Sequence, residues 1–244
     1  SDTPTGTYSW GTLGSATLNQ PSGTDTNAGS GGHTPGNTTY TWTPPGAITG
    51  ARMLLVGGGG GGGMDMGGGG GAGGFLAIDS KDIPASEQTV VVGQGGIGAP
   101  NANGTNVLGQ TQPGAHTYTV PAYNGGDSII AGETAYGGGR GGYTHNNDDR
   151  QHGWPGGSGG GVSGYNQSSR NSPGGTGVPG QGNNGGSSNT SHYAGGGGGA
   201  GQAGTSANAE PKGGDGLPSD ILGTEYWWSG GGGGGGYTIN GGDG

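Results

Sequence analysis

Short apolar runs bounded by turn residues are spread through the first half of the chain. Some alternate bulky and small side chains, as in Tyr40–Thr43, and others are continuously apolar, as in Ala51–Val56, which leads into a tract of glycines. Runs of roughly four to six such residues predict β-strands. No stretch of about ten residues has the apolar spacing of an amphipathic helix, so we expect almost no α-helix. The predicted strands lie at residues 40–43, 51–56, 75–78, 89–92, 118–120 and 128–131.

Unbroken glycine tracts dominate the rest of the sequence, which holds 74 glycines among its 244 residues. In an α-helix each glycine costs about 1 kcal/mol relative to alanine, and in a sheet interior it weakens the strand. The strict three-residue period of collagen is absent. The remaining regular conformation is the extended left-handed helix with three residues per turn, called polyglycine II, whose backbone groups must bond to neighbouring chains. The longest tracts are Gly57–Gly63, Gly67–Gly71, Gly195–Gly199 and Gly230–Gly236.

The alternative to this ordered arrangement is disorder, because more than a third of the chain is glycine or proline. Charged residues make up only 9% of the chain, however, so nothing forces it to stay expanded. We therefore expect a mostly β and irregular fold, with a small β-sandwich-like layer and a bundle of packed polyglycine II helices. We interpret residues 1–38 as a polar extension in which Tyr8 and Trp10 could anchor the chain. We interpret residues 39–244 as one glycine-rich domain and expect it to be almost strand-free after residue 131. A valine inside a packed tract, as at Gly60, should disrupt this fold far more than one at Gly98.

The order of strands and glycine runs is similar to that of a known family. Residues Tyr40–Val56 precede a glycine run and then Gly70–Leu76, and the later matching segments are Thr89–Gly96, Asn124–Ile129, Ala135–Gly139 and Gly230–Asp243. Over roughly residues 38–244 this order resembles the glycine-rich domain common in tailed-phage virion and tail-fibre proteins. It is also distantly similar to the glycine-rich domain of anaplastic-lymphoma-type receptor kinases. The resemblance implies a β-sandwich-like layer with polyglycine II helices.

Composition narrows the setting of the protein. The chain has no cysteine, which excludes a disulfide scaffold and a thiolate metal site. Its net charge of −9 argues against a nucleic-acid partner. It has no run of about twenty apolar residues, so no membrane span is expected, and Lys81 and Lys212 are its only lysines. An acidic, lysine-poor chain fits an exposed, protease-resistant component of a virion surface or another extracellular structure.

The sequence carries no motif of catalysis. Glycine-spaced nucleotide fingerprints match by chance within the tracts, and neither lysine follows a phosphate-loop pattern. The five histidines lack metalloprotease spacing. Glu133, Asp148 and Asp149 could form a carboxylate pair for glycosidic cleavage, although solvated loop acids explain them as well. We expect a non-enzymatic protein that needs no cofactor.

Polar segments with aromatic residues are the candidates for recognition. Loops that join packed glycine helices must emerge at the ends of the bundle, and aromatic side chains give rigid contact area for protein or sugar partners. These segments could form a host-receptor surface or could simply cover the bundle ends. Asp148 and Asp149 could also hold a hard cation such as Ca²⁺, or form an ordinary solvated turn. The candidate receptor-binding residues are Tyr143, His145, Trp154, Tyr165, Arg170 and Tyr193.

Three adjacent aromatic residues, Tyr226, Trp227 and Trp228, precede the last glycine tract. Such residues are costly to leave in water, so we expect them to form an assembly interface with a partner subunit or another virion protein. A homo-oligomer is expected, although no heptad repeat specifies its order.

Three functional hypotheses follow. The chain is a virion structural protein, as a fibre, tail appendage or capsid decoration; an adhesin that attaches a phage to a bacterial surface protein or glycan; or an extracellular filament subunit or cell-surface binding domain. Neighbours packed on Tyr226–Trp228 favour the first, a free tip carrying residues 143–154 favours the second, and a polymer of this chain alone favours the third.

Overall fold

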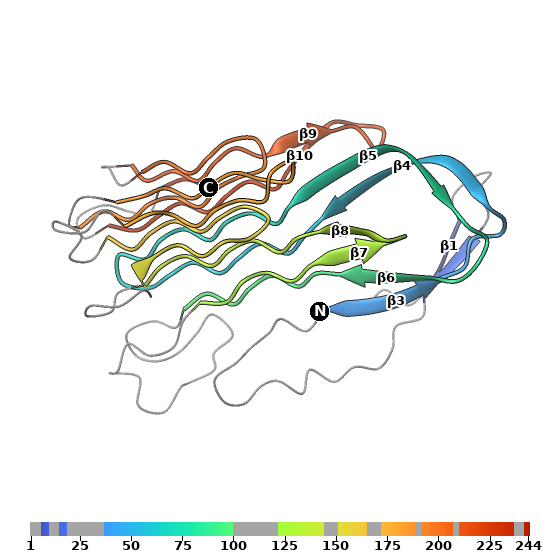
Figure 1. Cartoon of the computed structure of the whole chain (residues 1–244), viewed down its shortest axis with the longest axis horizontal. Helices are drawn as coiled ribbons and strands as arrows, with labels where there is room; N and C mark the ends of the chain where they lie inside the picture. Colours follow the sequence, from blue (N-terminus) through green and yellow to red (C-terminus); the bar gives the residue numbers. More distant parts are fainter. Residues whose placement is uncertain are drawn as a thin grey trace, which may run out of the picture.

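The fold consists of short strands that continue into extended glycine threads (Figure 1). The computed structural model describes residues 37–99, 122–143, 151–164, 172–188, 192–206, 210–236 and 242–244, and the backbone of two further strands near the N-terminus. No helix is present in this part of the chain, as the sequence predicts. The strands are β1 (Gly6–Ser9), β2 (Ser15–Leu18), β3 (Thr38–Trp42), β4 (Ile48–Val56), β5 (Phe75–Ile83), β6 (Gln88–Val92), β7 (Ser128–Ile130), β8 (Glu133–Ala135), β9 (Leu217–Ser219) and β10 (Tyr226–Trp228).

The strands pair into several small antiparallel sheets. One sheet has four strands in the order β3-β6-β7-β8, and three two-stranded sheets are formed by β1 with β2, β4 with β5, and β9 with β10. In the first sheet Tyr40 lies opposite Val90, and in the β4–β5 pair Val56 lies opposite Phe75. The β4–β5 pair packs beside β7 and β8. The mostly β and irregular fold predicted from the sequence is confirmed.

Two predicted strands extend further than their apolar runs indicate. β4 begins at Ile48 and β5 continues to Ile83. The added half of β5 is polar, but it still pairs with β4, because Lys81 lies opposite Ala51 and the Gly50 N–H donates to Asp82 Oδ1 at 2.9 Å. The strand predicted at 118–120 lies outside the described residues.

The glycine threads have the three-fold symmetry of polyglycine II. The N–H groups of Gly57, Gly60 and Gly63 all donate to carbonyls of the antiparallel thread 67–74, at 2.8 to 3.0 Å. Those of Gly58 and Gly61 donate to a different thread, 122–126, at 2.9 Å. Every third residue therefore faces the same neighbour, as a helix with three residues per turn requires.

The interior of the molecule is built from these threads. Residues 67–75, 157–164 and 194–199 are buried throughout, and most of them are glycine. Because a polyglycine II thread has no internal hydrogen bonds, each buried backbone group must find its partner on a neighbouring thread. The threads that bond to 67–74 are 57–63, 136–142, 158–161, 195–198 and 231–235.

Side chains contribute little to this interior. The buried apolar side chains include several alanines; of the larger ones, Leu55, Phe75 and Ile83 belong to the strands, and Tyr143 and Val162 lie in the threads. A Cβ built on Gly60 would lie 2.2 Å from the carbonyl oxygen of Gly139, closer than real Cβ atoms approach. A Cβ on Gly59, in the same thread, would come no nearer than 3.8 Å to the Gly71 oxygen. Glycine is therefore a steric requirement of the packed faces of a thread, but not of its open face.

This difference predicts opposite results for two neighbouring alanine substitutions. Gly60→Ala should destabilise the protein by about 1–3 kcal/mol, because rigid backbone must move to make room for the methyl group. Gly59→Ala should be neutral or stabilising by about 0.4–1 kcal/mol, since alanine restricts the unfolded chain. Urea unfolding of both variants measures these free energies.

The valine pair extends the same test. Gly98→Val should be the milder change, because a Cβ there meets nothing nearer than 3.5 Å, whereas Gly60→Val places a branched side chain against Gly139. Equal tolerance within either pair would contradict the packed-thread core.

Candidate functional site

The described threads run between two distinct ends of the molecule (Figure 1). At one end, which we call the loop end, the chain reverses at the turn of Met64, Asp65 and Met66 and lies close to Gly164 and His192. The Gly164 N–H donates to the Met66 oxygen and the His192 N–H donates to the Gly164 oxygen, each at 2.8 Å. At the other end, the strand end, the threads become strands β4 to β10.

Among the described residues of the loop end, three non-glycine residues lie in the left-handed region. Their φ angles are 50° at Asp65, 59° at Met66 and 85° at His192. This conformation is uncommon for residues with a Cβ and costs free energy. Asp65 and Met66 adopt this conformation because the chain reverses tightly there. Threads 57–63 and 67–74, which this turn connects, are hydrogen-bonded directly to each other.

Tyr143 and Trp154, both predicted to bind a receptor, are brought together around Arg140. The Arg140 guanidinium lies 4.2 Å from the centre of the Trp154 ring and 5.9 Å from that of Tyr143, which places it for cation–π attraction. Tyr143 is only 2% exposed, whereas Trp154 is 40% exposed. Tyr143 therefore offers no contact surface on the single chain, and Trp154 is the member of this cluster that can meet a partner.

Of the other predicted receptor-binding residues, the structure describes only Tyr193. Tyr193 is half-buried beside Gly236, and its carbonyl accepts a hydrogen bond from Ser188 Oγ at 3.2 Å. His145, Tyr165 and Arg170, and the cation candidates Asp148 and Asp149, lie outside the described residues. A receptor surface at the loop end stays a prediction.

The predicted assembly residues form one strand of an exposed hairpin at the strand end. Tyr226, Trp227 and Trp228 are strand β10, paired with β9 so that Trp227 lies opposite Pro218. Trp227 is 67% exposed and Tyr226 is 52% exposed. Leu217 and Leu222 are also exposed on this hairpin, and sequence reasoning missed both because neither belongs to an apolar run long enough to predict a strand. An assembly role for these side chains stays a prediction.

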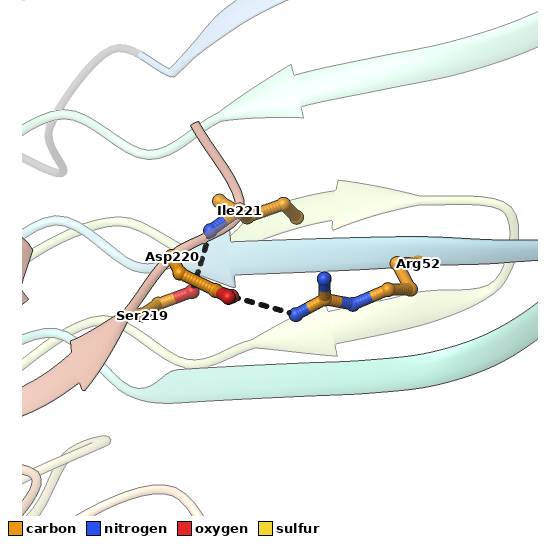
Figure 2. Close-up of polar contacts among 4 residues, drawn as sticks. All are labelled: Arg52, Ser219, Asp220 and Ile221. Carbon is orange, nitrogen blue, oxygen red and sulfur yellow. Dashed lines mark hydrogen bonds and ion pairs between the residues drawn. The ribbon is translucent and has the colours of Figure 1, made fainter. Parts of the chain in front are cut away.

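An ion pair joins the β9–β10 hairpin to strand β4 (Figure 2). Arg52 Nη2 on β4 donates to Asp220 Oδ1, in the turn of the hairpin, at 2.9 Å. The Ile221 N–H donates to Ser219 Oγ at 3.4 Å, and the Gly223 N–H to the Asp220 oxygen at 2.7 Å, so the turn is also fixed internally. The pKa of Asp220 is lowered, first by the hydrogen bond from Arg52 and then by its charge, and the pKa of Arg52 is raised by the same two causes.

An open pocket of about 410 Å³ lies beside β10. The lining residues other than glycine are Asp215, Trp227 and Trp228. A Cβ on Gly216 would lie 2.1 Å from the Trp228 oxygen, so close packing keeps this part of the wall bare backbone. Trp228 Nε1 and the neighbouring Ser229 Oγ are buried without a hydrogen-bond partner. The other lining residues are Gly214, Gly230 and Gly244.

The described part of the chain shows neither a metal cluster nor a membrane-spanning helix. Nowhere in it do three His, Asp or Glu side chains gather as a metal site would require. The same residues include no helix that is long and apolar enough to cross a membrane.

Comparison with known families gives one match. A family model described as a glycine-rich domain matches residues 33–244, which is most of the chain. Comparisons with curated proteins and with solved structures found no match. The domain boundary predicted at residue 38 stays a prediction.

The ion pair predicts that the hairpin loosens in acid. The pKa of Asp220 is lowered in the folded state. The ion pair therefore contributes fully to the stability of the hairpin above the unfolded pKa of about 3.9, and this contribution is lost as the pH falls below that value. Salt at about 1 M should weaken the same contact, because both groups are exposed. The fluorescence of Trp227 and Trp228 monitors the change. Asp220→Asn should abolish this acid transition while Asp215→Asn retains it, and a transition that persists in Asp220→Asn would contradict the assignment.

Proposed function

We propose that this chain, which belongs to the glycine-rich domain family, is a non-enzymatic structural protein of a tailed-phage virion. In this role it is exposed on the particle as part of a fibre, a tail appendage or a capsid decoration. The observation that carries the proposal is the buried lattice of backbone threads that connects the loop end to the strand end.

Such a lattice suits a spacer that holds two ends apart. A seven-residue glycine thread spans about 22 Å at the rise of polyglycine II, and lateral hydrogen bonds to several neighbours keep it straight. The interior depends on backbone contacts and needs no disulfide, since the chain has no cysteine. Its net charge of −9 favours the solubility of the free chain. These properties fit a rigid part that works outside the cell, on the surface of a particle.

Attachment to a host is the second candidate function. It is favoured by exposed aromatic side chains, Trp154 beside Arg140 and Trp227 on the hairpin, because such side chains are typical anchors of binding surfaces. A phage adhesin would use them to contact a bacterial surface protein or glycan. The distant similarity to receptor-kinase domains keeps an extracellular filament or cell-surface binding domain as a third candidate.

Location in the assembly tests the proposal. Antibodies raised against the purified chain should co-sediment with particles of the phage that encodes it and should label their outer surface in electron micrographs. Label restricted to the fibre tips would favour the adhesin. A polymer of this chain alone, or a chain that never accompanies the particle, would contradict a virion role.

A further inference from the structure

The open pocket beside β10 is large enough to hold a small ligand. Its volume of about 410 Å³ falls within the usual range of small-molecule pockets, about 300–1,000 Å³. It is lined by two tryptophans, one aspartate and a stretch of glycine backbone. We propose that this pocket binds a neutral saccharide; this role is independent of the structural function proposed above and specifies a ligand class for the adhesin, the second candidate function.

Trp227 supplies the apolar surface that a sugar ring needs. Trp227 is 67% exposed although it belongs to a strand, and it lines the pocket. A pyranose ring presents C–H groups on one face, and these carry slight positive charge that the negative face of an aromatic ring attracts. A flat, exposed indole therefore suits a sugar ring better than it suits a cation, which would be held by several enclosing rings.

Polar groups around the indole can bind the sugar hydroxyls. The carbonyl of Asp215 already accepts hydrogen bonds from Gly201 and Gln202, at 2.8 and 3.2 Å, which fixes the backbone that carries its exposed carboxylate. Gly230 is exposed and has no side chain to screen its peptide groups from a ligand. A few polar groups around an apolar surface are what gives a saccharide site its specificity.

The charge of the region selects a neutral ligand. Asp215, Asp220 and Glu225 lie on or beside the hairpin, and Arg52, the cation bound to it, is engaged by Asp220. This negative field opposes phosphate groups and acidic sugars. It also opposes a second copy of the chain, whose net charge is −9. The saccharide is therefore favoured over the subunit contact that the sequence predicts for Tyr226, Trp227 and Trp228.

Titration of the full chain with defined sugars tests the site. The probes are the neutral trisaccharides maltotriose, cellotriose and triacetylchitotriose, with trigalacturonic acid as the anionic probe, and binding is followed by calorimetry and by the indole N–H signals in NMR spectra. We expect at least one neutral probe to bind with a dissociation constant near 1 mM, and the anionic probe to bind at least tenfold more weakly.

Matched variants locate the binding on the hairpin. Trp227→Ala should weaken binding at least tenfold and Trp227→Phe should restore part of it, whereas Asp215→Asn should weaken it less. Leu222→Ala is the control, because Leu222 is as exposed as Trp227 but does not line the pocket. An unchanged unfolding midpoint shows that each variant is folded.

Three results would overturn the proposal. They are the absence of binding by every neutral probe, equal binding by Trp227→Ala and the wild type, and self-association that Trp227→Ala abolishes in a chain that binds no sugar. The last result would assign the hairpin to subunit contact. None of them bears on whether the chain is found on a virion, so failure of the saccharide site and failure of the proposed function remain distinguishable.

Discussion

The hydrogen bond between extended backbone threads is the interaction on which this structure depends. A buried N–H or C=O without a partner costs as much as a lost hydrogen bond, and a polyglycine II thread has none within itself. The thread 67–74 meets this demand by bonding to five surrounding segments. Such close approach on every side excludes a Cβ, so the glycine content follows from the packing. Each bond contributes only about 0.5–1.5 kcal/mol net, and each glycine costs conformational entropy, so stability depends on many bonds forming together.

The same interaction fixes where functional groups can lie. Threads continue directly from five strands, β4, β5, β6, β7 and β8. Segments that lie side by side in the strand layer therefore also lie side by side in the lattice. Side chains larger than alanine are excluded from most of the interior and gather at the two ends and on the outer faces. The aromatic hairpin is therefore carried at the strand end and joined to β4 by Arg52 and Asp220 (Figure 2). The loop end receives the turns between threads.

Much of the architecture could be predicted because it depends on composition and local pattern. The strands at Tyr40 and Val90 follow from their apolar runs, and the polyglycine II threads follow by elimination of other conformations. The polar end of β5 and the strand β9 could not be predicted, since Lys81 pairs only because β4 is already beside it and Pro218 argues against a strand. The neighbours of each thread were also unpredictable, because glycine carries no side chain that could specify a partner. The pocket could not be predicted from the sequence either, because Asp215 and Trp227 come to line it only through the packing of the threads.

Residue-resolved hydrogen exchange on the glycine-labelled protein tests the backbone core most directly. The account predicts that the amides of Gly68, Gly69 and Gly71, which donate to three different positions in neighbouring threads at 2.8 to 3.0 Å, exchange only through global unfolding. The exposed amide of Gly59 should exchange far faster, although it lies in the same lattice. If the amides of Gly68, Gly69 and Gly71 exchanged at the rate of an unstructured chain while the strands stayed protected, the interior would not be a hydrogen-bonded lattice and the account would be wrong.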